Sequence, residues 1–151
     1  MENQEGFTLI ETLIVLLISS ILLLVPTLSM ERLTEELEIN LFFYELTSNL
    51  TLMQNQAIMG GRGTKVSFLE TKERDYITFD VNVGHPLNRE MILDRPYHLV
   101  AKNKPEEFRF KGGTGNITSS STIKIYTTKG QYKLTYLLGS GRFDIKEDFK
   151  K

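Results

Sequence analysis

The sequence predicts an α+β protein in which one long N-terminal helix packs on a small antiparallel β-sheet. Near the N-terminus, an apolar run passes into a segment whose apolar residues recur every three or four positions, the spacing of one helix face. Beyond residue 63 apolar and polar residues alternate instead, which is the pattern of half-buried strands. The chain has 151 residues, enough for one small core and too few for a multidomain enzyme.

The apolar segment covers residues 7–25 and contains one charged residue, Glu11. At about 1.5 Å per helical residue, such a segment matches the roughly 30 Å of hydrocarbon in a bilayer. We therefore predict a membrane-spanning helix over residues 7–26. A secretory signal peptide is not favoured, because the apolar run is too long and no basic residue precedes it. A charge in hydrocarbon costs about 2.5 to 3.5 kcal/mol on insertion scales, so Glu11 is either a functional residue or one that reaches the interface.

An amphipathic helix is predicted to follow over residues 27–60. Pro26 lacks a backbone donor and is expected to kink the helix where the two parts meet. Two apolar series then run at helical spacing, namely Met30, Leu33, Leu37, Leu41 and Tyr44, and Phe43, Leu46, Leu50, Met53 and Ala57. Both are expected to lie against apolar surface. Gly60 and Gly61 supply the stop signal of what is then a single helix of roughly fifty residues.

Residues 61–151 are predicted to form an antiparallel meander with one face covered by the helix. Strands are expected at Val66–Phe68, Ile77–Val83, Ile123–Ile125, Tyr132–Leu138 and Phe143–Ile145. The predicted turns are Lys129-Gly130 and Gly139-Ser140-Gly141. The intervening stretch from His85 to Ser121 is rich in proline and glycine, so we expect a loop-rich, variable or mobile surface there.

The near-neutral total of 18 basic and 19 acidic residues hides a division of charge. Residues 27–60 hold five acids and one base, whereas residues 61–151 hold eleven acids and seventeen bases. Seven of these bases are candidate DNA contacts: Lys102, Lys104, Arg109, Lys111, Lys124, Lys129 and Lys133. Basic residues near aromatic ones can hold nucleic acid through phosphate contacts and stacking. The pattern also fits lysines on the solvent face of strands, or a face complementary to the acidic helix of a neighbouring chain.

No group of residues predicts an enzyme. His85 and His98 lie thirteen positions apart with Asp94 between them, but no third ligand stands at a metal-binding spacing. The absence of cysteine excludes disulfides and thiolate sites. The glycines at 60, 61 and 63 lack P-loop spacing, and Ser140 between two glycines is a hairpin turn rather than a nucleophile elbow. We therefore expect no catalytic residue, no metal and no cofactor.

The N-terminal residues resemble a known processing signal. A polar leader ends in Gly6 and is followed by Phe7-Thr8-Leu9-Ile10-Glu11 and the apolar run, which resembles the class III signal of type IV pilins and pseudopilins. The resemblance implies a leader peptide of residues 1–6, cleavage between Gly6 and Phe7 by a prepilin peptidase, and N-methylation of Phe7. It further implies a pilin-like fold, a segment 7–26 that serves both as anchor and as polymerisation surface, and a role for Glu11 in assembly.

Other stretches narrow the resemblance. The segments ELTSNLTLMQNQAI, TKVSF and YLLGSGRFDIKEDFKK resemble the ComGD-type minor pseudopilins of Gram-positive competence systems. This implies a structural subunit of a transformation pseudopilus that assists the uptake of extracellular DNA across the cell wall. The implied partners are other major and minor pseudopilins, the prepilin peptidase, and an assembly-platform membrane protein with its cytoplasmic ATPase. The implied location is the cell membrane, crossed once with the globular domain outside, and the cell surface after incorporation.

Two alternatives stay open at this point. A type II secretion pseudopilin or a type IV pilus minor pilin would share the features of the N-terminal half. A membrane-anchored module that never polymerises, and that binds DNA or wall polymer, would share the apolar segment and the basic residues.

Overall fold

The computed structural model describes residues 8–94, 97–100, 106–117, 122–137, 139 and 141–148, without the side chains of residues 24–32, Val100 and Glu106. Its elements are α1 (Leu9–Gly60), β1 (Thr64–Leu69), β2 (Asp75–Asp80), β3 (Arg89–Leu93), β4 (His98–Val100), β5 (Glu106–Phe110), β6 (Thr122–Tyr126), β7 (Gln131–Tyr136) and β8 (Phe143–Glu147). The chain divides into two compact units, Met1–Leu41 and Phe42–Lys151.

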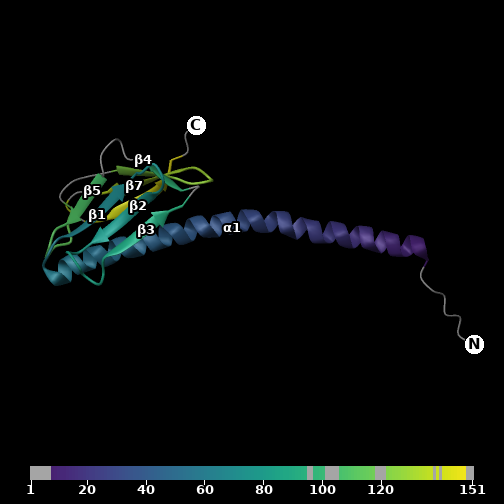
Figure 1. Cartoon of the computed structure of the whole chain (residues 1–151), viewed down its shortest axis with the longest axis horizontal. Coiled ribbons are helices and arrows are strands. Elements are labelled where there is room, and N and C mark those ends of the chain that lie inside the picture. The colour runs from purple at the N-terminus through teal and green to yellow at the C-terminus, as the bar shows by residue number, and fades with distance from the viewer. Residues whose placement is uncertain are drawn as a thin grey trace, which may run out of the picture. The chain divides into compact units, whose positions relative to one another are not determined.

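Helix α1 is continuous from Leu9 to Gly60, which confirms the long N-terminal helix (Figure 1). Thr8 caps its start, because its Oγ1 accepts a hydrogen bond from the Glu11 N–H at 3.4 Å. The helix ends where Gly61 adopts a φ of 66°, a left-handed conformation that glycine takes without strain. The kink at Pro26 stays a prediction, since that side chain lies outside the described residues.

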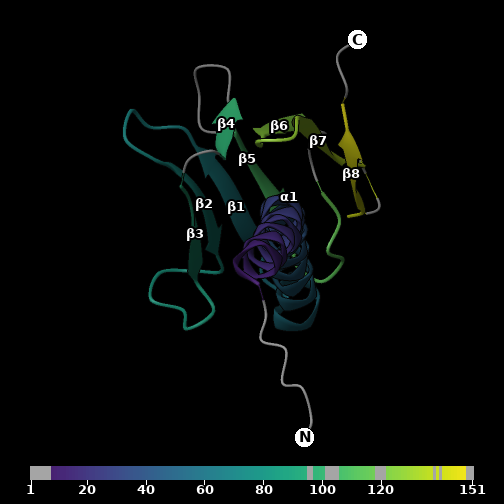
Figure 2. The same ribbon diagram turned by 90° about the vertical axis from the view of Figure 1, so that its right-hand side faces the viewer.

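The strands form two antiparallel sheets rather than the one predicted meander. The first sheet has the order β3-β2-β1-β5 and the second the order β4-β6-β7-β8. In Figure 2, β1 to β3 lie to the left and β7 and β8 to the right. The predicted hairpins β1-β2, β6-β7 and β7-β8 are present, but β1 also pairs with the distant β5. Such a non-local pairing has no signal in local periodicity, and this is why the single meander is wrong.

The predicted loop-rich stretch from His85 to Ser121 contains β3, β4 and β5, so that prediction is wrong. Leu99, Phe108 and Phe110 from these strands are buried in the core. The prolines and glycines of the stretch flank the strands instead of interrupting them. Val83 was predicted to extend β2, but β2 ends at Asp80 and the Val83 side chain is fully exposed.

One apolar core joins the C-terminal part of α1 to both sheets, along which it lies (Figure 1). The second helical series supplies Leu46, Leu50, Met53 and Ala57, which have no exposed surface. Burying a large apolar side chain contributes about 1.5 to 3 kcal/mol, so this series fixes the helix on the sheets.

The first apolar series of the helix is not buried. Its described members, Leu33, Leu37, Leu41 and Tyr44, are 59 to 74% exposed, so the expectation that they are covered is wrong for the isolated chain.

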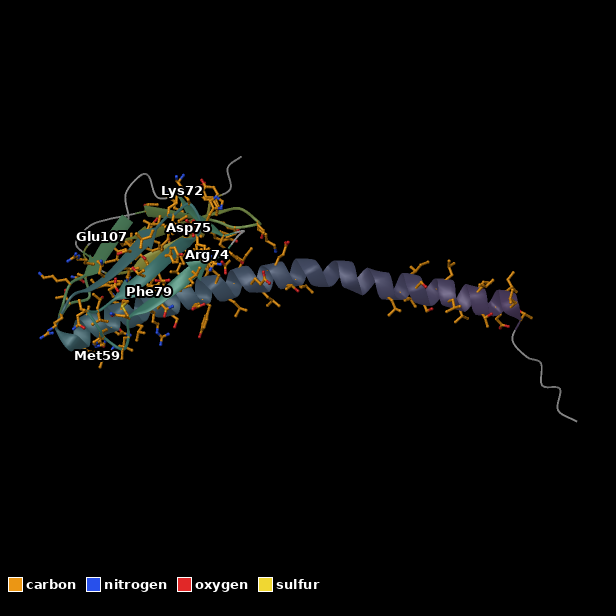
Figure 3. All side chains as sticks on the ribbon, in the orientation of Figure 1. Met59, Lys72, Arg74, Asp75, Phe79 and Glu107 are labelled. Carbon is orange, nitrogen blue, oxygen red and sulfur yellow. The ribbon has the colours of Figure 1, made fainter. Side chains whose placement is uncertain are left out.

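A buried carboxylate connects the two sheets. Asp75 begins β2 of the first sheet, and its Oδ2 accepts a hydrogen bond of 2.7 Å from the Leu99 N–H on β4 of the second sheet. Its Oδ1 accepts a second, at 3.2 Å, from the Thr71 N–H. Figure 3 shows Asp75 with Lys72 and Arg74 at one end of β2 and Phe79 toward the other end.

Candidate functional site

The N-terminal part of α1 presents apolar side chains on all its faces. Every large apolar side chain from Leu9 to Leu23 is between 50 and 80% exposed. A helix that is apolar all round is not stable in water alone and belongs in lipid or against other protein. Within the described residues, no helix is both long enough and apolar enough to qualify as a membrane span.

The hydroxyl groups of this part of α1 are satisfied by the helix itself. Thr12 Oγ1 donates to the Leu9 carbonyl at 2.8 Å, and Ser19 and Ser20 both donate to the Leu16 carbonyl, at 3.0 and 2.7 Å. Hydroxyl groups bonded in this way enter an apolar environment without leaving an unpaired donor. They therefore require no partner from outside the helix.

Glu11 differs from these residues, because its carboxylate makes no hydrogen bond or ion pair with any described residue of the chain. It stands at the third helical position, where the unpaired N–H groups and the helix dipole favour a negative charge. That interaction is weak compared with the cost of placing a carboxylate in hydrocarbon. The helix thus carries one charge that needs a cation from elsewhere. Gly6 and Phe7, the predicted cleavage and methylation positions, lie outside the described residues and stay predictions.

The five basic candidates that the structure describes are divided between the two sheets. Lys102 and Lys104 lie outside the described residues. Arg109 belongs to β5 of the first sheet and pairs with Glu107 at 3.5 Å, and Lys111 directly follows that strand. Lys124 and Lys133 belong to neighbouring strands of the second sheet, where they are direct cross-strand partners, with Lys129 in the turn between them. Of the described candidates, the structure therefore brings Lys124 and Lys133 together on the second sheet and places Arg109 on the first.

The histidines have structural roles. His85 Nδ1 accepts a hydrogen bond from the Leu87 N–H at 3.2 Å. The His98 ring stacks on Tyr126 with centroids 4.8 Å apart, and Asp94 pairs with Arg74 at 3.7 Å. The described side chains contain no group of three or more His, Cys, Asp or Glu that could hold a metal ion.

A cleft beside Asp75 is lined by residues 70–75 and by Leu93, Tyr97, His98 and Leu99. Its charged groups have both signs: Glu70, Glu73 and Asp75 against Lys72 and Arg74. Asp75 is already bonded to backbone donors. In this cleft the Asp75 carboxylate therefore acts as an acceptor for the backbone.

One buried ionisable group escaped the sequence analysis. Tyr136 on β7 is 1% exposed, and its ring lies against Phe108 with centroids 3.9 Å apart. Its hydroxyl has no hydrogen-bond partner among the described residues. Burial raises the pKa of Tyr136 well above its usual value of 10.0. The group therefore stays neutral and belongs to the core.

The N-terminal sequence and the fold each match known proteins. Residues 1–25 match the family model of the prokaryotic N-terminal methylation motif. The crystal structure of the type IV minor pilin FimU of Pseudomonas aeruginosa superposes with a TM-score of 0.56 at 19% identity, covering 75% of this chain and 91% of that one. A second crystal form of FimU gives a TM-score of 0.50 at 18% identity, over 68% of this chain and 88% of that one. The chain thus has a minor-pilin fold behind a prepilin-type N-terminus.

Its similarity to one particular protein extends over nearly the whole length. Competence protein ComGD of Bacillus subtilis (strain 168) is 26% identical over 146 residues, which cover 97% of this chain and 96% of the relative. The resemblance to competence pseudopilins that the sequence suggested is therefore confirmed by the similarity to ComGD. The chain also has the α+β fold of a pilin.

Proposed function

We propose that the chain is a minor pseudopilin of a competence pseudopilus, a structural subunit that assists the uptake of extracellular DNA across the cell wall. The observation that carries the proposal is the unpaired Glu11 carboxylate in the first turn of a helix that is apolar on all faces. The similarity to ComGD over 97% of the chain favours a competence system over a secretion system or a type IV pilus.

The proposed assembly step satisfies Glu11 from a second subunit. Cleavage after Gly6 leaves an α-ammonium group at Phe7, which is then methylated. When the helices of two subunits lie side by side in the fibre, the ammonium of one can approach the Glu11 of the other. Each charge is costly alone in an apolar environment, so the pair forms only between processed subunits. Segment 7–26 anchors the chain in the membrane before assembly and packs against other helices afterwards.

The proposed partners follow from this pathway. They are the prepilin peptidase, the other major and minor pseudopilins, and the assembly-platform protein with its cytoplasmic ATPase. The globular unit lies outside the membrane, and it reaches the cell surface once the subunit enters the pseudopilus. We propose a structural rather than a catalytic role, because the solved structures with this fold include type IV minor pilins.

Incorporation into the fibre tests the proposal. Pseudopili are sheared from competent cells that express a C-terminally tagged chain, and the tag is measured in the fibre fraction. We expect wild type in that fraction and Glu11→Ala at less than a hundredth of its level, since removing one partner of a buried pair costs about 3 to 5 kcal/mol. Glu90→Ala, which removes an exposed carboxylate on β3, is the matched control and is expected to assemble normally.

Two results would count against the proposal. Equal incorporation of Glu11→Ala and wild type would show that no charge pair drives assembly of this subunit. Absence of the wild-type chain from the fibre, together with normal DNA uptake in its deletion strain, would favour the membrane-anchored module that does not polymerise.

A further inference from the structure

Three lysines stand in a row across the second sheet. The register pairs Lys124 on β6 with Lys133 on β7, and Lys133 with Lys146 on β8. Neighbouring strands are about 4.8 Å apart, so the row is roughly 10 Å wide. Sequence analysis placed Lys124 and Lys133 in a basic stretch but did not single out Lys146, because only the β7-β8 register brings it beside them.

The row lies on the face of the sheet that points away from the core. Side chains alternate along a strand, and the neighbours Ile123, Ile125 and Leu134 are buried in the core. Lys133 and Lys146 are exposed and Lys124 is half-buried. We call this surface, comprising Lys124, Lys133 and Lys146 with the adjoining His98 and Tyr126, the lysine face.

Like charges directly opposite each other on neighbouring strands destabilise a sheet. Asp144 partly offsets the row, since its Oδ2 lies 2.9 Å from Lys146 Nζ. Neither Lys124 nor Lys133 has an ion pair or hydrogen bond with any described residue. Lys124 and Lys133 therefore repel each other in the fold with no described acid paired to either, an arrangement that an acidic partner outside the chain would relieve.

An aromatic pair borders the row. His98 on β4 pairs with Tyr126 on β6, and their rings stack 4.8 Å apart at an interplanar angle of 11°. Tyr126 lies two residues from Lys124 and so on the same face of β6. Lysines next to flat rings are typical of surfaces that hold a nucleic-acid strand through phosphate contacts and base stacking.

The first sheet offers a contrast. Its outward residues Lys65 and Arg109 are cross-strand partners, but each has an acid nearby, Asp80 at 3.9 Å from Lys65 and Glu107 at 3.5 Å from Arg109. That surface is neutralised from within the chain, whereas the lysine face is not.

We infer that the lysine face binds the phosphate backbone of nucleic acid, with Lys124, Lys133 and Lys146 each neutralising one phosphate. The inference rests on the proposed function, which brings the chain to extracellular DNA, and it adds the surface through which this chain touches it. Binding through three phosphates is weak and sequence-independent, and it depends steeply on salt.

The test measures binding of the full chain, in non-ionic detergent, to fluorescently labelled duplex DNA at 50, 100 and 200 mM salt. Three phosphate contacts predict a slope of about −2.7 for log K against log salt, or about a 40-fold loss of affinity over this range. Each Lys→Gln substitution at positions 124, 133 and 146 is expected to reduce the slope by about 0.9. Lys72→Gln, an exposed lysine between β1 and β2 of the first sheet, is the matched control and should leave the slope unchanged.

Two outcomes would overturn the inference: no salt-dependent binding by wild type, or an equal effect of Lys72→Gln and Lys133→Gln. Measuring fibre incorporation of the same variants separates this inference from the proposed function. A triple Lys→Gln variant that assembles but does not bind DNA supports both, and a wild type that assembles without binding DNA refutes only the lysine face. A triple variant that binds DNA normally but fails to assemble would make the face a subunit contact.

Discussion

Replacing Asp75 by alanine should loosen the connection between the two sheets. The substitution removes two hydrogen-bond acceptors. One accepts from the buried Leu99 N–H at 2.7 Å, and the other accepts from the partly buried Thr71 N–H at 3.2 Å. A hydrogen bond to a charged group contributes about 1.5 to 3 kcal/mol, and a buried donor without an acceptor costs about as much. Thr71 is exposed, so water can replace its acceptor, whereas Leu99 has no exposed surface and its N–H is the costlier one to leave unpaired. We therefore expect the free energy of unfolding to fall by about 2 to 4 kcal/mol.

Urea unfolding of the full chain in non-ionic detergent, followed by tyrosine fluorescence, measures this loss. Asp94→Ala is the control, because it removes an exposed carboxylate 3.7 Å from Arg74 and should cost less than about 1 kcal/mol. Asp75→Asn keeps one acceptor oxygen and is expected to fall between the two. If Asp75→Ala is no more destabilising than Asp94→Ala, the carboxylate does not hold the sheets together.

Three further substitutions test the core, a turn and the lysine row. Tyr136→Phe removes a buried hydroxyl without a described partner and should stabilise the fold by about 1 kcal/mol. Because burial raises the pKa of Tyr136, wild type should lose more stability than Tyr136→Phe as the pH rises above about 10, and equal alkaline profiles would contradict this. Gly115→Ala should lower the free energy of unfolding by more than the roughly 1 to 2 kcal/mol that a left-handed alanine costs, because its Cβ would lie 2.7 Å from the Ile58 side chain. The Cβ of Gly113→Ala meets open space, so this variant is the control. Equal shifts of the urea midpoint in the two variants would refute the packing argument. Lys133→Thr removes the repulsion between this residue and Lys124, its cross-strand partner, and should raise the free energy of unfolding by about 0.2 to 1 kcal/mol. A lower free energy of unfolding would contradict repulsion within the row.

Local patterns in the sequence carried the prediction of the helix and the hairpins. Each of these patterns depends on residues close together in the sequence. Helical spacing and the glycines after residue 59 predict α1 and its end, and strict alternation around Ile77 and Leu134 predicts β2 and β7. Pairings between distant segments have no such signal. The β1-β5 and β4-β6 pairings join segments that lie far apart in the sequence, and β4 has only three residues.

The candidate sites were predictable to different degrees. Glu11 stood out because a single charge interrupts a long apolar run, which is visible without a structure. Asp75 did not, since a carboxylate in a polar connection resembles any solvated residue until Leu99 is placed opposite it. The lysine row depends on strand register, because Lys146 joins Lys133 only through the pairing of β7 with β8. Which apolar helical series is buried also follows only from the position of the sheets.

We propose above all that this chain is processed and assembled as a pseudopilin subunit. Intact-mass and N-terminal peptide analysis of the chain extracted from the membrane of competent cells tests it most directly. The predicted result is a mature chain that begins at N-methylated Phe7 and lacks residues 1–6. A chain that retains Met1 and the following five residues in cells with an active prepilin peptidase would contradict the claim.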